Sequence, residues 1–149
     1  MPGKRKPKLR ERIRKFFQRK DVPRRSSSGE PSPRILKQLD LVEERLPRYI
    51  EEKGYWVPGR TMDDAARQIG CDKEAINYYF KERLQTDFRT WRTRLRIEDA
   101  KCIFLEQPDI SASAVAERVG FRDRSNFSRQ FALHTGCSIT QWRAEHPAE

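Results

Sequence analysis

The segment VAERVGFRDRSNFSRQF, residues 115–131, contains arginines whose chemistry suits the recognition of planar acceptor groups. A guanidinium group presents N–H donors in a fixed fork, which matches the paired acceptors of a phosphate or of the guanine base edge. Aromatic residues alternate with these arginines in the order Phe121, Arg122, Arg124, Phe127, Arg129, Phe131. A helix through this segment would bury the rings on one side, so the arginines would project from the other side.

The rest of the chain predicts further helices, which would have to hold this segment in place. Apolar residues recur at helical spacing from residue 35, and Ser32 with Pro33 supplies a start signal. Pro47 is expected to break or kink this first helix. A long helix is expected from about residue 88 to 106. Because no alternating β pattern of useful length is present, the predicted fold class is all-α.

Two stretches of the chain share one pattern. TMDDAARQIGCDKEAINYYF, residues 61–80, and SASAVAERVGFRDRSNFSRQF, residues 111–131, each contain a capped helix, a Gly at the corner, a turn with an Asp, and a second helix that ends in Phe. In the first stretch, Asp72 is expected to cap the second helix. This order is typical of a helix-turn-helix. We therefore predict one such unit at about residues 61–84 and another at about 111–134, joined by the long bridging helix.

The bridging helix and the second unit carry a family resemblance. RLRIEDAK at residues 94–101, AERVGFRDRSNFSRQF from residue 116 and TGCSITQWR up to residue 143 resemble the DNA-binding domain of AraC/XylS-type bacterial transcription regulators. The resemblance implies a domain over residues 35–149 that reads successive major-groove faces of double-stranded DNA with two helix-turn-helix units. We expect a monomer on DNA, with RNA polymerase as a further candidate partner.

The resemblance also indicates which side chains would read bases. The positions that match the family's major-groove contacts are Arg124, Ser125, Ser128 and Arg129. In the first unit the outward face would show Glu74, Asn77 and Tyr78, of which Asn can pair with adenine and Glu can accept from cytosine. Base reading and mere positioning are both open for this face, because Glu74 repels phosphate if it misses its base.

Contacts to the DNA backbone are expected from helix starts and from flanking cations. Thr61 and Ser111 cap helices at their positive ends, where backbone amides suit phosphate oxygens. The cations expected beside the reading faces are Lys73, Lys81 and Arg122. The alternative for the second unit is a solvated charged face, with Arg122 merely paired with Asp123.

Positive charge is concentrated at the start of the chain. Residues 1–34 hold 13 Lys or Arg and 3 Asp or Glu, a net of +10, whereas residues 35–149 hold 19 of each. We predict a basic, largely disordered tail and linker over residues 1–34, because this composition offers little to bury. The charge favours a polyanionic partner. A solvated arm along DNA is favoured over a membrane-surface helix, which is usually longer.

The remaining chemistry-bearing residues offer no enzyme site or metal site. The cysteines are scattered without a CxxC pair, and the chain has two histidines; these residues are Cys71, Cys102, Cys137, His134 and His146. The sequence contains no Gly-rich phosphate loop and no convergent catalytic group. We therefore expect no catalytic residue, no metal and no cofactor. Because the chain lacks an apolar run of about 18 residues, a cytoplasmic location is expected.

A second class of function is open from the sequence. A helix-turn-helix scaffold can also serve as an adaptor that binds protein, or an anionic surface through its basic arm. RNA is a weaker candidate partner, because the narrow major groove of A-form RNA does not admit a reading helix. Removal of the arm separates the first two classes, since a DNA reader would keep its sequence preference without the arm.

Overall fold

A computed structural model describes residues 30–147 of the chain, and within this range it contains helices and no β-strand. The elements are α2 (Pro33–Glu51), the short 3₁₀ turn η1 (Gly54–Trp56), α3 (Met62–Ile69), α4 (Lys73–Glu82), α5 (Phe88–Glu106), α6 (Ala112–Arg118), α7 (Arg124–Thr135) and α8 (Ile139–Glu145). The all-α prediction is confirmed. Most of the expected tail, residues 1–29, lies outside the described residues.

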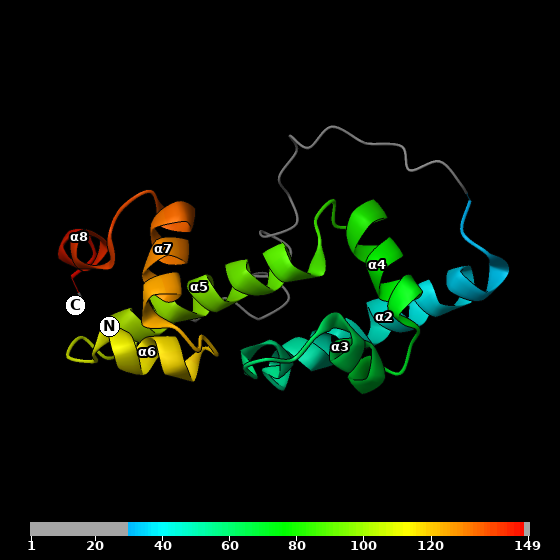
Figure 1. Ribbon diagram of the computed structural model, residues 1–149, viewed down its shortest axis with the longest axis horizontal. Coiled ribbons are helices and arrows are strands. Elements are labelled where there is room, and N and C mark those ends of the chain that lie inside the picture. The colour runs from blue at the N-terminus through cyan, green and yellow to red at the C-terminus, as the bar shows by residue number, and fades with distance from the viewer. Residues whose placement is uncertain (1–29, 148–149) are drawn as a thin grey trace, which may run out of the picture.

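The helices form two groups that share α5. Figure 1 shows α2, α3 and α4 at one end of α5 and α6, α7 and α8 at the other end, so that α5 connects the two groups. Each group has its own apolar cluster. Trp91 of α5 belongs to the first cluster, and Ile97, Ala100 and Phe104 of α5 belong to the second. The bridging helix therefore packs on both sides, as its loosely spread apolar positions predict.

Local signals set the boundaries of the second group. The Ser111 hydroxyl accepts a hydrogen bond from the N–H of Ala114 at 3.1 Å and starts α6. Gly120 has φ +96 at the corner before α7, a left-handed conformation that favours glycine. The carboxylate of Asp123 accepts from the N–H of Ser125 at 2.8 Å and starts α7. The second helix-turn-helix thus forms from capping residues and one glycine corner that the sequence displays.

The first group follows the same plan. Thr61 and Asp64 form a capping box at the start of α3, and Gly70, with φ +87, ends it. Helix α4 packs its apolar side against α2 and α3, and its buried residues are Ala75, Ile76, Tyr79 and Phe80. The repeated unit that the sequence predicts is therefore present at both ends of α5.

Two local expectations in the first group are contradicted in part. Helix α2 continues through Pro47 to Glu51, so the proline does not break the helix. Leu46 and Ile50, on either side of this proline, are buried in the same apolar cluster, which holds the helix continuous. Asp72 is the residue before α4, yet its carboxylate makes no capping bond and instead accepts from the side-chain amide of Gln38 at 3.0 Å.

Helix length and hydropathy bear on a possible membrane segment. Among residues 30–147, no helix is both long enough and apolar enough to cross a membrane.

Candidate nucleic-acid interface

Helix α7 has one buried side and one exposed side. Phe127 and Phe131 are fully buried, and Phe121, just before the helix, is 8% exposed. The rings of Phe121 and Phe127 lie 5.1 Å apart and those of Phe127 and Phe131 lie 6.0 Å apart, centre to centre. These contacts fix how α7 is rotated about its axis, because turning the helix would expose the rings.

The polar side of α7 carries the candidate base-reading residues. Arg124, Ser125 and Arg129 are exposed and Ser128 is half-buried. Arg129 donates from Nη2 to the side-chain oxygen of Asn126 at 2.9 Å, an exposed contact one helical turn earlier. This bond orients the guanidinium group while its other donors stay available to an incoming acceptor.

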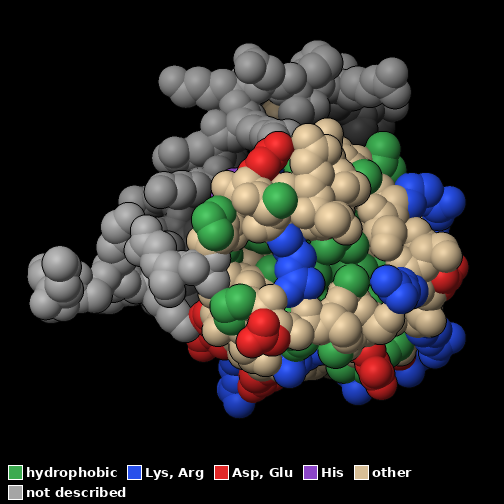
Figure 2. Space-filling model, turned by 90° about the vertical axis from the view of Figure 1, so that its left-hand side faces the viewer, with side chains coloured by type: hydrophobic (Ala, Val, Ile, Leu, Met, Phe, Trp, Pro, Cys, Tyr) green, Lys and Arg blue, Asp and Glu red, His purple; other side chains and the backbone are tan. Residues whose placement is uncertain are grey.

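Two hollows flank α7. One is lined by side chains of α6 and α7 together with Pro58: Pro58, Ser113, Ala116, Glu117, Phe121, Arg122 and Arg124. The other lies between α7 and the start of α8, and its lining includes Arg124, Ser128, Ala132 and Thr140. Arg124, the first residue of α7, borders both hollows. Figure 2 views this end of the molecule, where apolar and neutral side chains surround basic ones.

Arg122 was expected either to contact the DNA backbone or to pair with Asp123, and the structure bears only on the second expectation. Its neighbour Asp123 is bonded to the N–H of Ser125. The guanidinium group of Arg122 lies against Gly59, in the loop that precedes α3, so closely that a Cβ at Gly59 would overlap it. Arg122 is nevertheless exposed, so it lies between the two units and at the surface.

Helix α4 presents a more mixed face. Glu74 and Lys81 are exposed, and Asn77 and Tyr78 are half-buried. All four residues border a hollow whose other wall is the start of α2, with Ser32 and Ile35. Asn77 also borders a second hollow with three arginines, Arg60, Arg89 and Arg92. Asn77 therefore borders one hollow that holds both Glu74 and Lys81 and another that holds three arginines.

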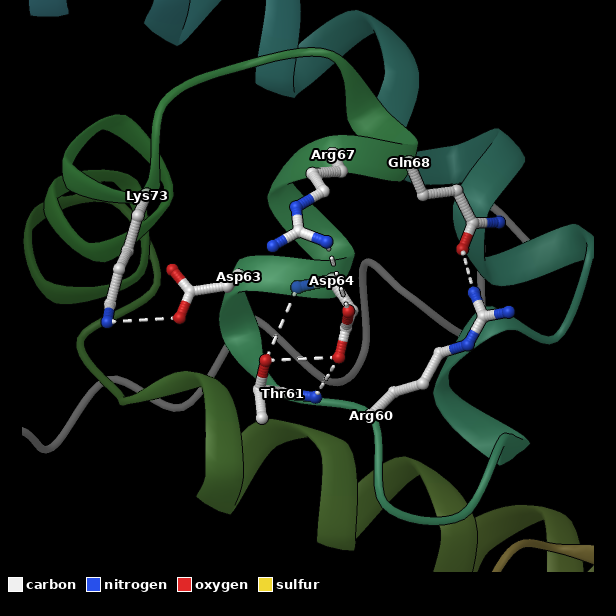
Figure 3. A network of polar contacts seen from close by, with 7 residues as sticks. All are labelled: Arg60, Thr61, Asp63, Asp64, Arg67, Gln68 and Lys73. Atoms are coloured by element: carbon white, nitrogen blue, oxygen red, sulfur yellow. Dashed lines mark hydrogen bonds and ion pairs between the residues drawn. The ribbon is translucent and has the colours of Figure 1, made fainter.

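The start of α3 is already occupied by carboxylates. Both the backbone N–H and the hydroxyl of Thr61 donate to Asp64, at 2.8 and 3.1 Å, as Figure 3 shows. These bonds lower the pKa of Asp64, so its carboxyl group is ionised at neutral pH. Lys73 forms an ion pair with Asp63 at 3.3 Å. Helix α3 thus begins with two acids, whereas the first turn of α6, at Ser111, has none.

Sequence reasoning missed two buried charged residues of α5. Arg96 is 6% exposed and Asp99 is 5% exposed, and both bond to the segment around η1. The sequence did contain a signal for them. The bridging helix packs on both sides, so some of its charged residues must lie near the apolar clusters, and charged residues are rarely buried unless they are paired.

Comparisons with known proteins agree with this architecture. Residues 65–145, more than half of the chain, match a family profile described as a helix-turn-helix domain. This profile is that of the AraC-type helix-turn-helix. The chain belongs to the AraC-type helix-turn-helix family. This is a family of DNA-binding transcription regulators, and the all-helical fold agrees with that of AraC-type DNA-binding domains.

Curated relatives from this family are longer than the chain. The transcriptional activator NphR of Rhodococcus is 35% identical over 86 residues, which cover 58% of this chain and 25% of NphR. The arabinose operon regulatory protein of Escherichia coli is 24% identical over 120 residues, which cover 74% of this chain and 41% of that protein. The chain thus spans less than half the length of these relatives. By name, the first relative is a transcriptional activator and the second is an operon regulatory protein.

Solved structures show the same fold. A transcriptional regulator of Chromobacterium violaceum described as containing an AraC-type DNA-binding domain aligns with a TM-score of 0.62 and 20% identity, over 75% of this chain and 96% of that one. The C-terminal domain of AraT, a response regulator from Geobacillus stearothermophilus, aligns with a TM-score of 0.56 and 20% identity, over 78% and 88%. At this identity the likeness concerns the fold alone.

Proposed function

We propose that the chain is a transcription regulator that binds double-stranded DNA sequence-specifically and inserts α4 and α7 into successive major-groove faces. The geometry of α7 carries this proposal. Three buried phenylalanines fix its inner side, which leaves Arg124 and Arg129 exposed at positions that match the family's groove contacts. An arginine at such a position can bind guanine O6 and N7 together.

The size of the bridging helix supports two readers. Helix α5 has 19 residues, which corresponds to about 28 Å at 1.5 Å per residue. Successive turns of the major groove on one side of B-DNA lie about 34 Å apart. Because α4 and α7 lie at the two ends of α5 (Figure 1), one chain can supply both readers. A monomer on DNA fits this arrangement.

The two readers have unequal roles in this proposal. Helix α7 is the main base reader, since its outward face combines arginines with small hydroxyl side chains. Helix α4 contributes Asn77 as a base contact and Lys81 as a phosphate contact, whereas Glu74 limits its attraction to the backbone. Ser111 and Arg122 remain the proposed phosphate contacts of the second unit. Tyr78, which borders the same hollow as Asn77, is a further proposed base contact of α4.

General attraction to DNA is assigned to the start of the chain. Residues 1–29 hold 12 Lys or Arg and 2 Asp or Glu, whereas residues 30–149 hold 20 of each. Residues 30–149 therefore have no formal net charge with which to attract DNA, and their affinity depends on where individual cations lie. We assign salt-dependent, sequence-independent attraction to residues 1–29 and sequence preference to α4 and α7.

Selection from a random duplex pool with purified protein tests this function. The pool should become enriched in one sequence, and binding is then measured on that duplex and on a scrambled one. Arg129→Ala should lose about 1 to 3 kcal/mol on the selected duplex and much less on the scrambled one. Arg118→Ala, which removes one exposed arginine at the end of α6, is the matched control and should weaken both duplexes slightly and equally.

Two results would contradict the proposal. A pool without enrichment would remove sequence-specific binding and favour an adaptor. Equal weakening of both duplexes by Arg129→Ala would mean that this side chain contacts only phosphate.

A further inference from the structure

The segment from Lys53 to Arg60 lies between the two helix-turn-helix units and contacts both. Tyr55 is 1% exposed and belongs to the first apolar cluster. Trp56, half-buried, packs against the first and the second cluster. The segment is therefore more than a connection from α2 to α3, because its side chains join the two apolar clusters.

Asp99 of α5 holds the first part of this segment. Its carboxylate accepts a hydrogen bond from Nε1 of Trp56 at 2.8 Å and another from the hydroxyl of Tyr55. Lys53 lies 3.4 Å from the same carboxylate oxygen, as an ion pair. A buried carboxylate destabilises the fold unless it is paired. Asp99 and these three partners are therefore held together.

Arg96 of α5 holds the second part. It donates from Nε to the carbonyl of Tyr55 at 2.6 Å and from Nη2 to the carbonyl of Val57 at 3.3 Å. Its guanidinium carbon lies 5.6 Å from the centre of the Phe121 ring, in the second unit. Burial lowers the pKa of Arg96 to about 10, so the group still carries its charge at neutral pH. Arg96 thus connects α5 both to the segment from Lys53 to Arg60 and to the second unit.

The second unit also meets the segment directly. A Cβ at Gly120, the corner of this unit, would overlap the carbonyl oxygen of Trp56. The corner therefore has to be a glycine for steric reasons as well as for its φ of +96. Arg122, two residues later, lies against Gly59 of the segment. Backbone meets backbone here, so a shift of one unit would have to move the other.

We propose that Asp99 and Arg96 are positioning residues which fix the separation and the relative rotation of α4 and α7, and thereby the spacing between the two DNA segments that the protein accepts. The proposal rests on the proposed use of two reading helices. Apolar contacts are non-directional, so the two clusters by themselves fix the relation between the two units less sharply than hydrogen bonds do. Hydrogen bonds to a charged group are directional and strong, and here they connect the segment to a single helix.

The geometry of DNA turns this rigidity into selectivity. One base pair of B-DNA advances the helix by about 3.4 Å and rotates it by about 35°, since a turn of about 34 Å holds about 10 base pairs. Two readers in a fixed relation match one spacing, and an extra base pair moves the second site out of register. Readers in a loose relation would tolerate several spacings.

A spacing series tests the proposal with the full chain. The duplexes carry the selected site with one or two base pairs added or removed between its two read segments. Wild-type protein should lose about tenfold or more for one added base pair, because the second reading helix then misses its base contacts, a loss at least as large as that of one mismatched position. Arg96→Met removes the directional donors and keeps an apolar chain of similar reach, and Trp56→Phe removes the N–H that binds Asp99 and keeps a ring. Both variants should lose only about threefold for the same change.

Ile103→Val is the matched control, because it trims a buried side chain of the same helix away from the segment. It should keep the wild-type spacing profile although it lowers the melting temperature. Trp56→Phe retains an aromatic side chain and decides the test if Arg96→Met does not fold. If folded variants weaken binding equally at every spacing, Asp99 and Arg96 are merely structural and the inference is wrong.

The outcomes also separate this inference from the proposed function. Wild-type protein that distinguishes neither sequence nor spacing contradicts the proposed function, and with it the positioning role. Wild-type protein that selects one spacing, beside variants that select it equally sharply, contradicts the positioning role alone. A flattened spacing profile with retained preference for the sequence of each read segment supports both.

Discussion

Replacement of Phe127 by alanine tests the assignment of inner and outer sides in α7. The side chain is fully buried, and its ring lies 5.1 Å from that of Phe121 and 6.0 Å from that of Phe131. The variant loses the transfer free energy of the ring, about 1.5 to 3 kcal/mol, and two aromatic contacts of about 0.5 to 1.5 kcal/mol each. The residual cavity adds to this loss. The expected cost is about 3 to 5 kcal/mol in the free energy of unfolding.

This cost is a large fraction of the usual stability of a domain, about 5 to 15 kcal/mol. We expect the melting temperature to fall by roughly 10 to 25 °C. The damage should be concentrated in the second apolar cluster, to which Phe127 belongs, because the first cluster is built from other residues. Amide hydrogen exchange should therefore accelerate more in α7 than in α4.

Urea unfolding followed by circular dichroism gives the stability, with Leu133→Ala as the control. Leu133 lies on the same helix but is 71% exposed, so its truncation should change the stability by no more than about 0.5 kcal/mol. An unchanged midpoint for Phe127→Ala, or equal losses for the two variants, would refute the assignment of faces and with it the placement of Arg124 and Arg129.

Three further changes have defined outcomes. Deletion of residues 1–29, which spares the Ser32 cap of α2, should weaken binding to every duplex alike. The slope of log affinity against log salt concentration should become shallower by about 0.9 for each phosphate that this arm neutralises. Loss of sequence preference would instead mean that the arm reads the sequence. Burial, and next the neighbouring Asp72, raises the pKa of Cys71 to about 11 from 9.0. Iodoacetamide at pH 8 should therefore alkylate this thiol about 100-fold more slowly in the folded than in the urea-unfolded chain. Equal rates would contradict its burial. Thr61→Ala removes the cap of α3 and should cost about 1 kcal/mol in urea unfolding, whereas an unchanged midpoint would show that Asp64 alone suffices.

The helices and their duplication could be predicted because their signals are local. Capping joins residues two or three positions apart, as in Thr61 with Asp64 and Asp123 with Ser125, and helical periodicity joins residues three or four apart. The rings of Phe127 and Phe131 are spaced in this way, so the sequence also indicated which side of α7 faces inward. These features do not depend on how the two units are arranged.

Partners distant in the chain could not be predicted from such signals. Asp72 has the position of a capping residue, yet Gln38 and Arg34 of α2 bind its carboxylate, because α2 packs beside α4. The pairing of Lys73 with Asp63 likewise depends on how α3 docks against α4. Both interactions change the charge that the first unit presents, and neither leaves a periodic pattern.

The amino-acid sequence by itself determined the helical class, the two repeated units, the bridging helix and the aromatic side of α7. Only the tertiary structure decided the roles of Arg96 and Asp99, whose partners Tyr55, Trp56 and Val57 lie 39 to 44 positions earlier in the chain. The physical reason is range. Capping and amphipathic periodicity act within one or two helical turns, whereas a buried charge finds its partners only after separate units have packed together.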